Sequence, residues 1–103
     1  MTRTELLAWL DGRRPAPPPA LWAHLEAAVT DAPEPVPEHL ARLGRELLGR
    51  VTRHPAGGRE LALDLLAADA FVTYAFEAQA EADTSGLARL AEHVAAADEA
   101  NPA

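Results

Sequence analysis

The sequence predicts an all-α fold, a bundle of four or five helices around a central hydrophobic helix at about residues 59–82. Apolar residues recur at intervals of three and four in several segments, and stretches rich in proline or glycine separate those segments. No stretch shows the alternation of a β-strand. A chain of 103 residues, 49% of them hydrophobic, is long enough for one core. We therefore expect a single helical domain over residues 1–103.

The first predicted helix is short, from about Thr4 to Leu10. Thr2 and Glu5 have the spacing of a capping box, in which each side chain satisfies a free backbone N–H of the other residue. Gly12 is expected to end this helix in the left-handed conformation, which glycine adopts without strain.

Two proline-rich connectors, at about residues 13–19 and 31–37, flank a second helix expected over about residues 19–29. Consecutive prolines fix φ and remove backbone donors, so both connectors should be stiff and non-helical. The first contains a PxxP spacing that an aromatic groove of a partner could bind. We interpret this connector as a spacer, and the sequence leaves the alternative open.

The third helix, expected over about residues 37–54, has the most regular pattern in the chain. Its leucines form one stripe, and charges of alternating sign follow the opposite face at four-residue spacing. Gly44 lies inside the apolar stripe, where glycine costs about 1 kcal/mol relative to alanine. This position therefore predicts a close approach of another helix.

The fourth helix is apolar on most sides. Such a helix is either enclosed by other helices or shared with a second chain. We expect one face to be lined by Leu61, Leu65, Val72 and Phe76. The apolar residues that spread around the rest are candidate interface residues, unless the first two helices cover them: Leu63, Leu66, Phe71 and Tyr74.

The last helix is expected over about residues 85–97, with Ser85 in the break that caps its start. The tail at residues 98–103 is expected to fray, as chain ends commonly do.

Asp69 is the acid that the wheel of the fourth helix places next to its apolar face. A carboxylate withdrawn from water must pair, accept hydrogen bonds or change its pKa. One hypothesis makes Asp69 a ligand-binding acid, with hydroxyl groups from Thr73 and Tyr74 nearby. The favoured hypothesis is structural, a pair with an arginine or with a helix N-terminus.

Composition excludes several functional classes. A net charge of −7 disfavours nucleic-acid binding, and the absence of cysteine and lysine removes thiolate and Schiff-base chemistry. No segment predicts a membrane span or a signal peptide. No spacing predicts a metal site, a cofactor or a catalytic residue. Surface or helix-end positions are expected for the histidines, which are His24, His39, His54 and His93.

The leading functional hypothesis is a small cytoplasmic interaction or accessory protein that forms a homodimer through its third and fourth helices, or binds another protein. The first alternative is a small-molecule-binding bundle with an acidic pocket around Asp69. The least favoured alternative is a catalytic subunit whose site is shared across an interface. Basic residues that are all arginine, with abundant alanine and proline, suggest a GC-rich bacterial source.

Overall fold

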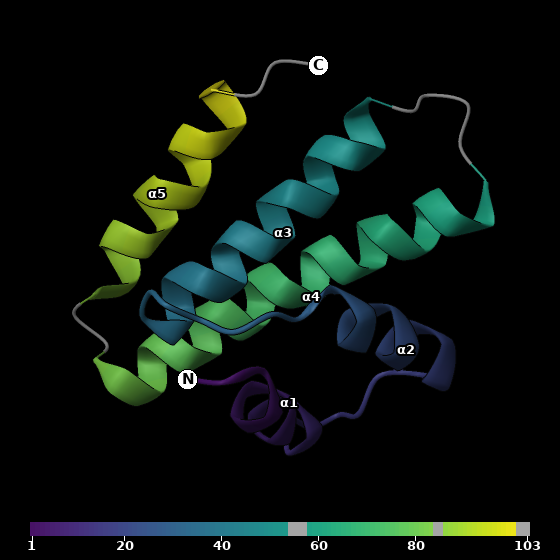
Figure 1. Cartoon of the computed structure of the whole chain (residues 1–103). Coiled ribbons are helices and arrows are strands. Elements are labelled where there is room, and N and C mark those ends of the chain that lie inside the picture. Colours follow the sequence, from purple (N-terminus) through teal and green to yellow (C-terminus); the bar gives the residue numbers. More distant parts are fainter. Residues whose placement is uncertain (54–57, 84–85, 101–103) are drawn as a thin grey trace.

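A computed structural model describes the backbone of residues 1–53, 58–83 and 86–100, and side chains up to residue 96. In this part of the chain α4 is central and packs against α2, α3 and α5, which confirms the predicted fold class (Figure 1). The helices are α1 (Arg3–Asp11), α2 (Pro19–Ala28), α3 (Val36–Thr52), α4 (Arg59–Ala82) and α5 (Leu87–Ala100). None of the helices in this described part combines the length and apolarity that a bilayer crossing requires.

The start of α1 is the predicted capping box. The Glu5 N–H donates to Thr2 Oγ1 at 3.2 Å, and the Thr2 N–H donates to Glu5 Oε1 at 3.0 Å. The bond from the Thr2 backbone holds the pKa of Glu5 below its usual value. The prediction for Gly12 is wrong, because this residue has a φ of −82° and lies in the right-handed region. The chain leaves α1 through a tight turn in which the Gly12 N–H donates to the Trp9 carbonyl.

The contact between α3 and α4 is close, as the position of Gly44 predicts. A Cβ atom at Gly44 would lie 2.9 Å from Val72 Cγ2 and 3.0 Å from the carbonyl oxygen of Ala68. The buried face of α4 is made largely of small residues around one phenylalanine, namely Ala67, Ala68, Phe71, Ala75 and Ala78. Small side chains on both helices bring the two backbones together.

The leucines of α4 do not form its buried face. Of the four residues expected along one face, Leu65 is exposed, and the other three are half-buried, namely Leu61, Val72 and Phe76. Leu65 keeps 49% of its surface exposed and Leu66 keeps 53%, whereas Phe71 is completely buried. Because α3 approaches at the alanine face, the longer side chains lie beside this contact or point away from it. The central helix is thus enclosed around Phe71 but carries leucine at its surface.

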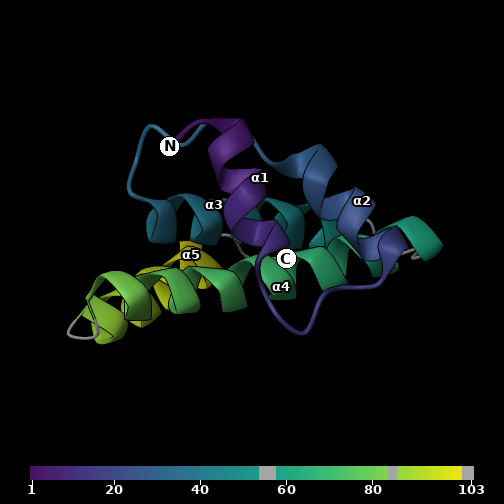
Figure 2. The ribbon, with the colours of Figure 1, turned by 90° about the horizontal axis from the view of Figure 1, so that it is seen from below.

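α1 and α2 lie together on one side of the α3–α4 pair (Figure 2). The Trp9 ring meets Tyr74 of α4 edge-on, with ring centroids 6.4 Å apart. Arg13 stacks over the Trp9 ring at 4.0 Å and binds Glu81 at 2.6 Å. The first two helices therefore cover part of α4, which was the alternative to a shared interface.

α5 packs against α3 and α4 and buries Leu90. It continues to Ala100, so residues 98–100 of the expected frayed tail are helical. The predicted cap at Ser85, the helix end at His54 and the last residues, 101–103, lie outside the described residues.

Candidate interaction surface

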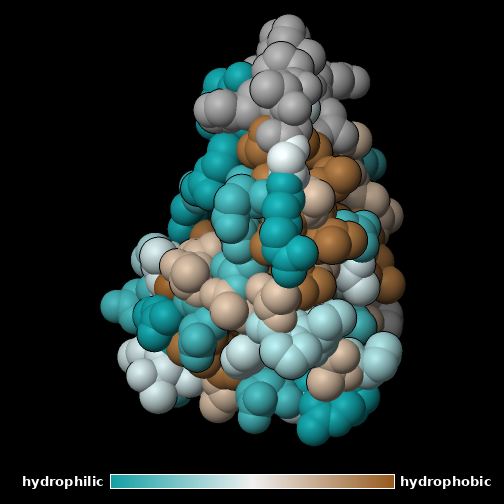
Figure 3. All heavy atoms as spheres, turned by 90° about the vertical axis from the view of Figure 1, so that its right-hand side faces the viewer, coloured by the Kyte–Doolittle hydropathy of each residue, from teal (hydrophilic) through white to brown (hydrophobic). Residues whose placement is uncertain are grey.

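A shallow groove of about 220 Å³ runs between α3 and α4, and we call it the α3–α4 groove. It is lined by Gly44, Arg45, Leu48, Leu65, Ala68, Asp69 and Val72. Gly44 and Ala68, which have little or no side chain, form the bottom of the groove where the two helices touch. Longer apolar side chains border it. Apolar residues gather on the side of the molecule shown in Figure 3, between polar ones. The close helix contact thus creates an apolar depression at the surface.

Opposite charges border this groove. Arg45 is contributed by α3 and Asp69 by α4, and the two side chains form no ion pair with each other. The nearest polar contact of Arg45 is weak, since its Nη1 lies 3.5 Å from Nε2 of His93 in α5. Asp69 is exposed, which makes the expectation that it is withdrawn from water wrong. It lies one helical position beyond the buried Ala68, and about 100° of rotation moves it to the rim.

The candidate ligand-binding residues do not share one site. Asp69 lies at the rim of the groove and Thr73 is exposed, whereas Tyr74 is buried against Trp9 of α1. Burial raises the pKa of Tyr74 above its usual value, because the phenolate would lose hydration. Asp69 and Tyr74 are five positions apart, so the α-helix directs them to different sides of α4.

The candidate interface residues also separate. Leu66 is exposed and Leu63 is half-buried, so both reach the surface. Phe71 and Tyr74 are buried within the chain and contribute to its core. The leucine that borders the groove is Leu65, which was expected on the face shared with Leu61, Val72 and Phe76 and not among the candidate interface residues.

The buried acid of α4 is Asp64, whereas the sequence pattern indicated Asp69. It is 3% exposed, and its Oδ1 lies 2.5 Å from His24 Nε2 of α2 and 3.4 Å from Arg50 Nη1 of α3. These two contacts join three helices, and because His24 is half-buried they correct the expectation that it is a surface residue. The position of Asp64, three and seven residues before Ala67 and Phe71, places it on the buried face and could have identified it.

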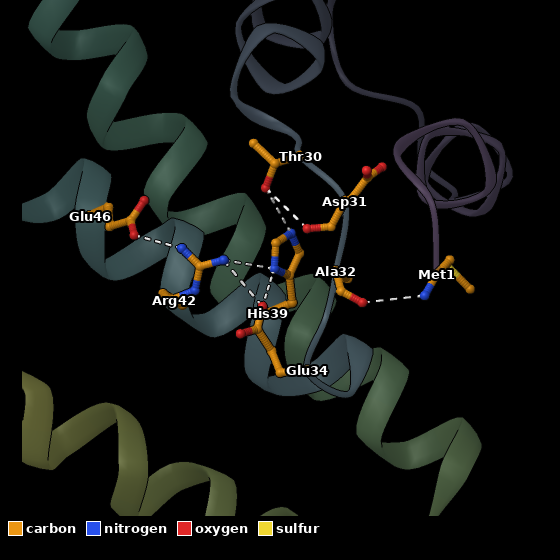
Figure 4. A network of polar contacts seen from close by, with 8 residues as sticks. All are labelled: Met1, Thr30, Asp31, Ala32, Glu34, His39, Arg42 and Glu46. Carbon is orange, nitrogen blue, oxygen red and sulfur yellow. Dashed lines mark hydrogen bonds and ion pairs between the residues drawn. The ribbon is translucent and has the colours of Figure 1, made fainter.

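A second polar network surrounds His39 (Figure 4). This histidine is completely buried, so the expectation that it lies at the surface is wrong. Its Nδ1 contacts Glu34 and lies 3.0 Å from Arg42 Nη2, and its Nε2 lies 3.5 Å from Thr30 Oγ1. Hydrogen bonds from His39 and then Arg42 hold the pKa of Glu34 below its usual value.

The order hydroxyl, imidazole and carboxylate in this network resembles a catalytic triad. A general base must reach the proton that it removes, however, and His39 exposes no surface to a substrate. We therefore assign the network a structural role. It attaches the connector before α3, including Thr30 and Glu34, to the first turns of that helix.

The described residues contain no group of three or more histidine, aspartate or glutamate side chains that could hold a metal ion. Comparison of the chain with protein-family models, with curated proteins and with solved structures finds no match. The α3–α4 groove, with its apolar lining and charged rims, is the candidate interaction surface.

Proposed function

We propose that the protein is a small helical interaction module that self-associates through the α3–α4 groove. The observation that carries this proposal is the exposure of Leu65, 49% of whose surface faces solvent beside an apolar depression. Covering apolar surface contributes about 25 cal/mol per Å² to association. Leu48 and Val72 extend the apolar surface along the same groove. A second copy that covered these three side chains would bury the apolar surface that the single chain leaves exposed to solvent.

The groove suits a protein surface better than a small molecule. Its volume of about 220 Å³ is below the ~300–1,000 Å³ that is usual for ligand pockets. It is shallow, and Asp69 lies at its rim, whereas a binding pocket usually encloses its polar groups. A few apolar side chains from a partner would fill it. These features favour an interaction surface over a small-molecule site around Asp69.

The concentration dependence of the molecular mass tests the proposal. We expect sedimentation equilibrium to show a dimer that forms at micromolar concentration, and we expect Leu65→Ser to weaken it strongly. Leu66→Ser is the matched control, because Leu66 is exposed to a similar extent but does not line the groove. Circular dichroism would check that both variants keep their helices.

Two results would contradict the proposal. The first is a wild-type protein that stays monomeric up to high micromolar concentration. The second is equal weakening by both leucine substitutions, which would make the groove irrelevant.

The cytoplasmic location and bacterial origin that we expect from the sequence remain predictions.

A further inference from the structure

We propose that two copies pair about a two-fold axis that runs along the α3–α4 groove, so that Arg45 of each copy faces Asp69 of the other. This inference rests on the proposed self-association and adds its geometry. It makes the charged rims, together with the apolar floor, the part of the surface that selects a second copy of this chain as the partner.

Symmetry leaves two simple ways to place one groove face to face with its copy. In a closed dimer the same patch meets itself across an axis that lies in the interface. An axis across the groove places α3 on α3 and α4 on α4. An axis along the groove places α3 of each copy on α4 of the other. The two arrangements bury the same residues but oppose different ones.

The charges distinguish these arrangements. With the axis across the groove, α3 faces α3 and α4 faces α4, so Arg45 cannot oppose Asp69 of the second copy, and an axis at the level of these residues would place each charge against its own copy. With the axis along the groove, each arginine meets an aspartate, and the two-fold axis repeats that pair. Like charges placed opposite each other at an interface are unfavourable, so the rims favour the second arrangement.

Both charged groups are available for a partner. Among the described residues, Asp69 is exposed and makes no ion pair, and the one polar side-chain contact of Arg45 is that with His93 at 3.5 Å. Leu48 of α3 and Leu65 of α4 lie on opposite sides of the same groove. The axis along the groove therefore also brings Leu65 of one copy toward Leu48 of the other.

Charge reversal tests the axis in the full-length protein. We expect Arg45→Asp and Asp69→Arg each to raise the dimer dissociation constant about tenfold, because each reversal turns two attractive pairs into repulsive ones. The double variant R45D/D69R should return to the wild-type value. An equimolar mixture of the two single variants should form a mixed dimer, since every pair in it is again of opposite sign. Glu26→Arg, which makes the same charge change as Asp69→Arg but on α2 outside the groove, should have little effect.

Cross-linking gives a second readout that does not depend on affinity. The natural chain has no cysteine, so Arg45→Cys and Asp69→Cys introduce single thiols. With the axis along the groove, a bismaleimide of short span should join the two variants when they are mixed. Each variant alone should give little product. Efficient cross-linking of each variant with itself would overturn the proposal.

The outcomes distinguish a wrong symmetry axis from the absence of self-association. If the wild type dimerises and Leu65→Ser abolishes the dimer, but neither charge reversal weakens it, this axis is wrong and self-association through the groove stands. A double variant no better than the single variants would also overturn the axis. A monomeric wild type would contradict both proposals.

Discussion

Replacing Gly44 with alanine tests the closest contact in the fold. Alanine would gain about 1 kcal/mol in helix propensity at this position of α3. Its Cβ atom, however, would lie 2.9 Å from a methyl group of Val72 and 3.0 Å from the backbone oxygen of Ala68. A backbone atom yields only if the helix moves, so the cost should lie in the upper part of the usual range for overpacking, at about 2–3 kcal/mol. We expect a net loss of about 1–2 kcal/mol, which lowers Tm by about 5–15 °C.

Thermal and urea denaturation followed by circular dichroism would measure this loss. Gly12→Ala is the matched control, because a Cβ atom there meets nothing closer than 3.5 Å and its φ of −82° suits alanine. The control should be neutral or stabilising by up to about 1 kcal/mol. A Gly44→Ala protein as stable as the wild type would refute the close approach of α3 to α4.

Further predictions concern the two polar networks. Asp64→Ala should lower the free energy of unfolding by about 1–3 kcal/mol, because it leaves the half-buried His24 without its partner. Asp69→Ala should change it by less than about 0.5 kcal/mol, and equal losses in urea denaturation would contradict this assignment. The lowered pKa of Glu34 makes its contribution to stability complete above the ordinary value of 4.5, and that contribution disappears as the pH falls through the lowered pKa. Glu34→Gln should therefore flatten the acid limb of the profile of Tm against pH, and an unchanged limb would argue against the contact with His39.

A comparison of Asp64 with Asp69 shows why the sequence pattern predicted burial of the wrong acid in α4. Asp69 lies among large apolar residues on the helical wheel, and their hydrophobicity indicated burial. The buried face instead consists of alanines around Phe71, and Asp64 belongs to that face. Alanine is common on exposed and buried helix surfaces alike, so an alanine stripe gives a weaker indication of burial than leucine does.

The polar partners were beyond the reach of a local pattern. His24 and Asp64 are 40 positions apart, and only the packing of α2 against α4 brings them together. His39 is buried because the connector before α3 folds back over the start of that helix. Neither arrangement has a periodicity that could be read from the chain.

What the sequence determined by itself is local. Its apolar periodicity, its capping box and its prolines set the helices within a few residues, and the bounds of the central helix at 59–82 agree with α4. The close helix contact at Gly44 could also be predicted, because a glycine inside an apolar helical stripe usually marks the close approach of another backbone.

Tertiary structure alone decided which side of α4 faces inward. Hydrophobicity favoured the leucines, but the free energy of packing depends on how closely two surfaces fit, and small residues let α3 and α4 approach. The same choice left Leu65 at the surface beside a groove with an arginine on one rim and an aspartate on the other. The candidate site is thus a consequence of how two helices pack, which no single segment of the chain encodes.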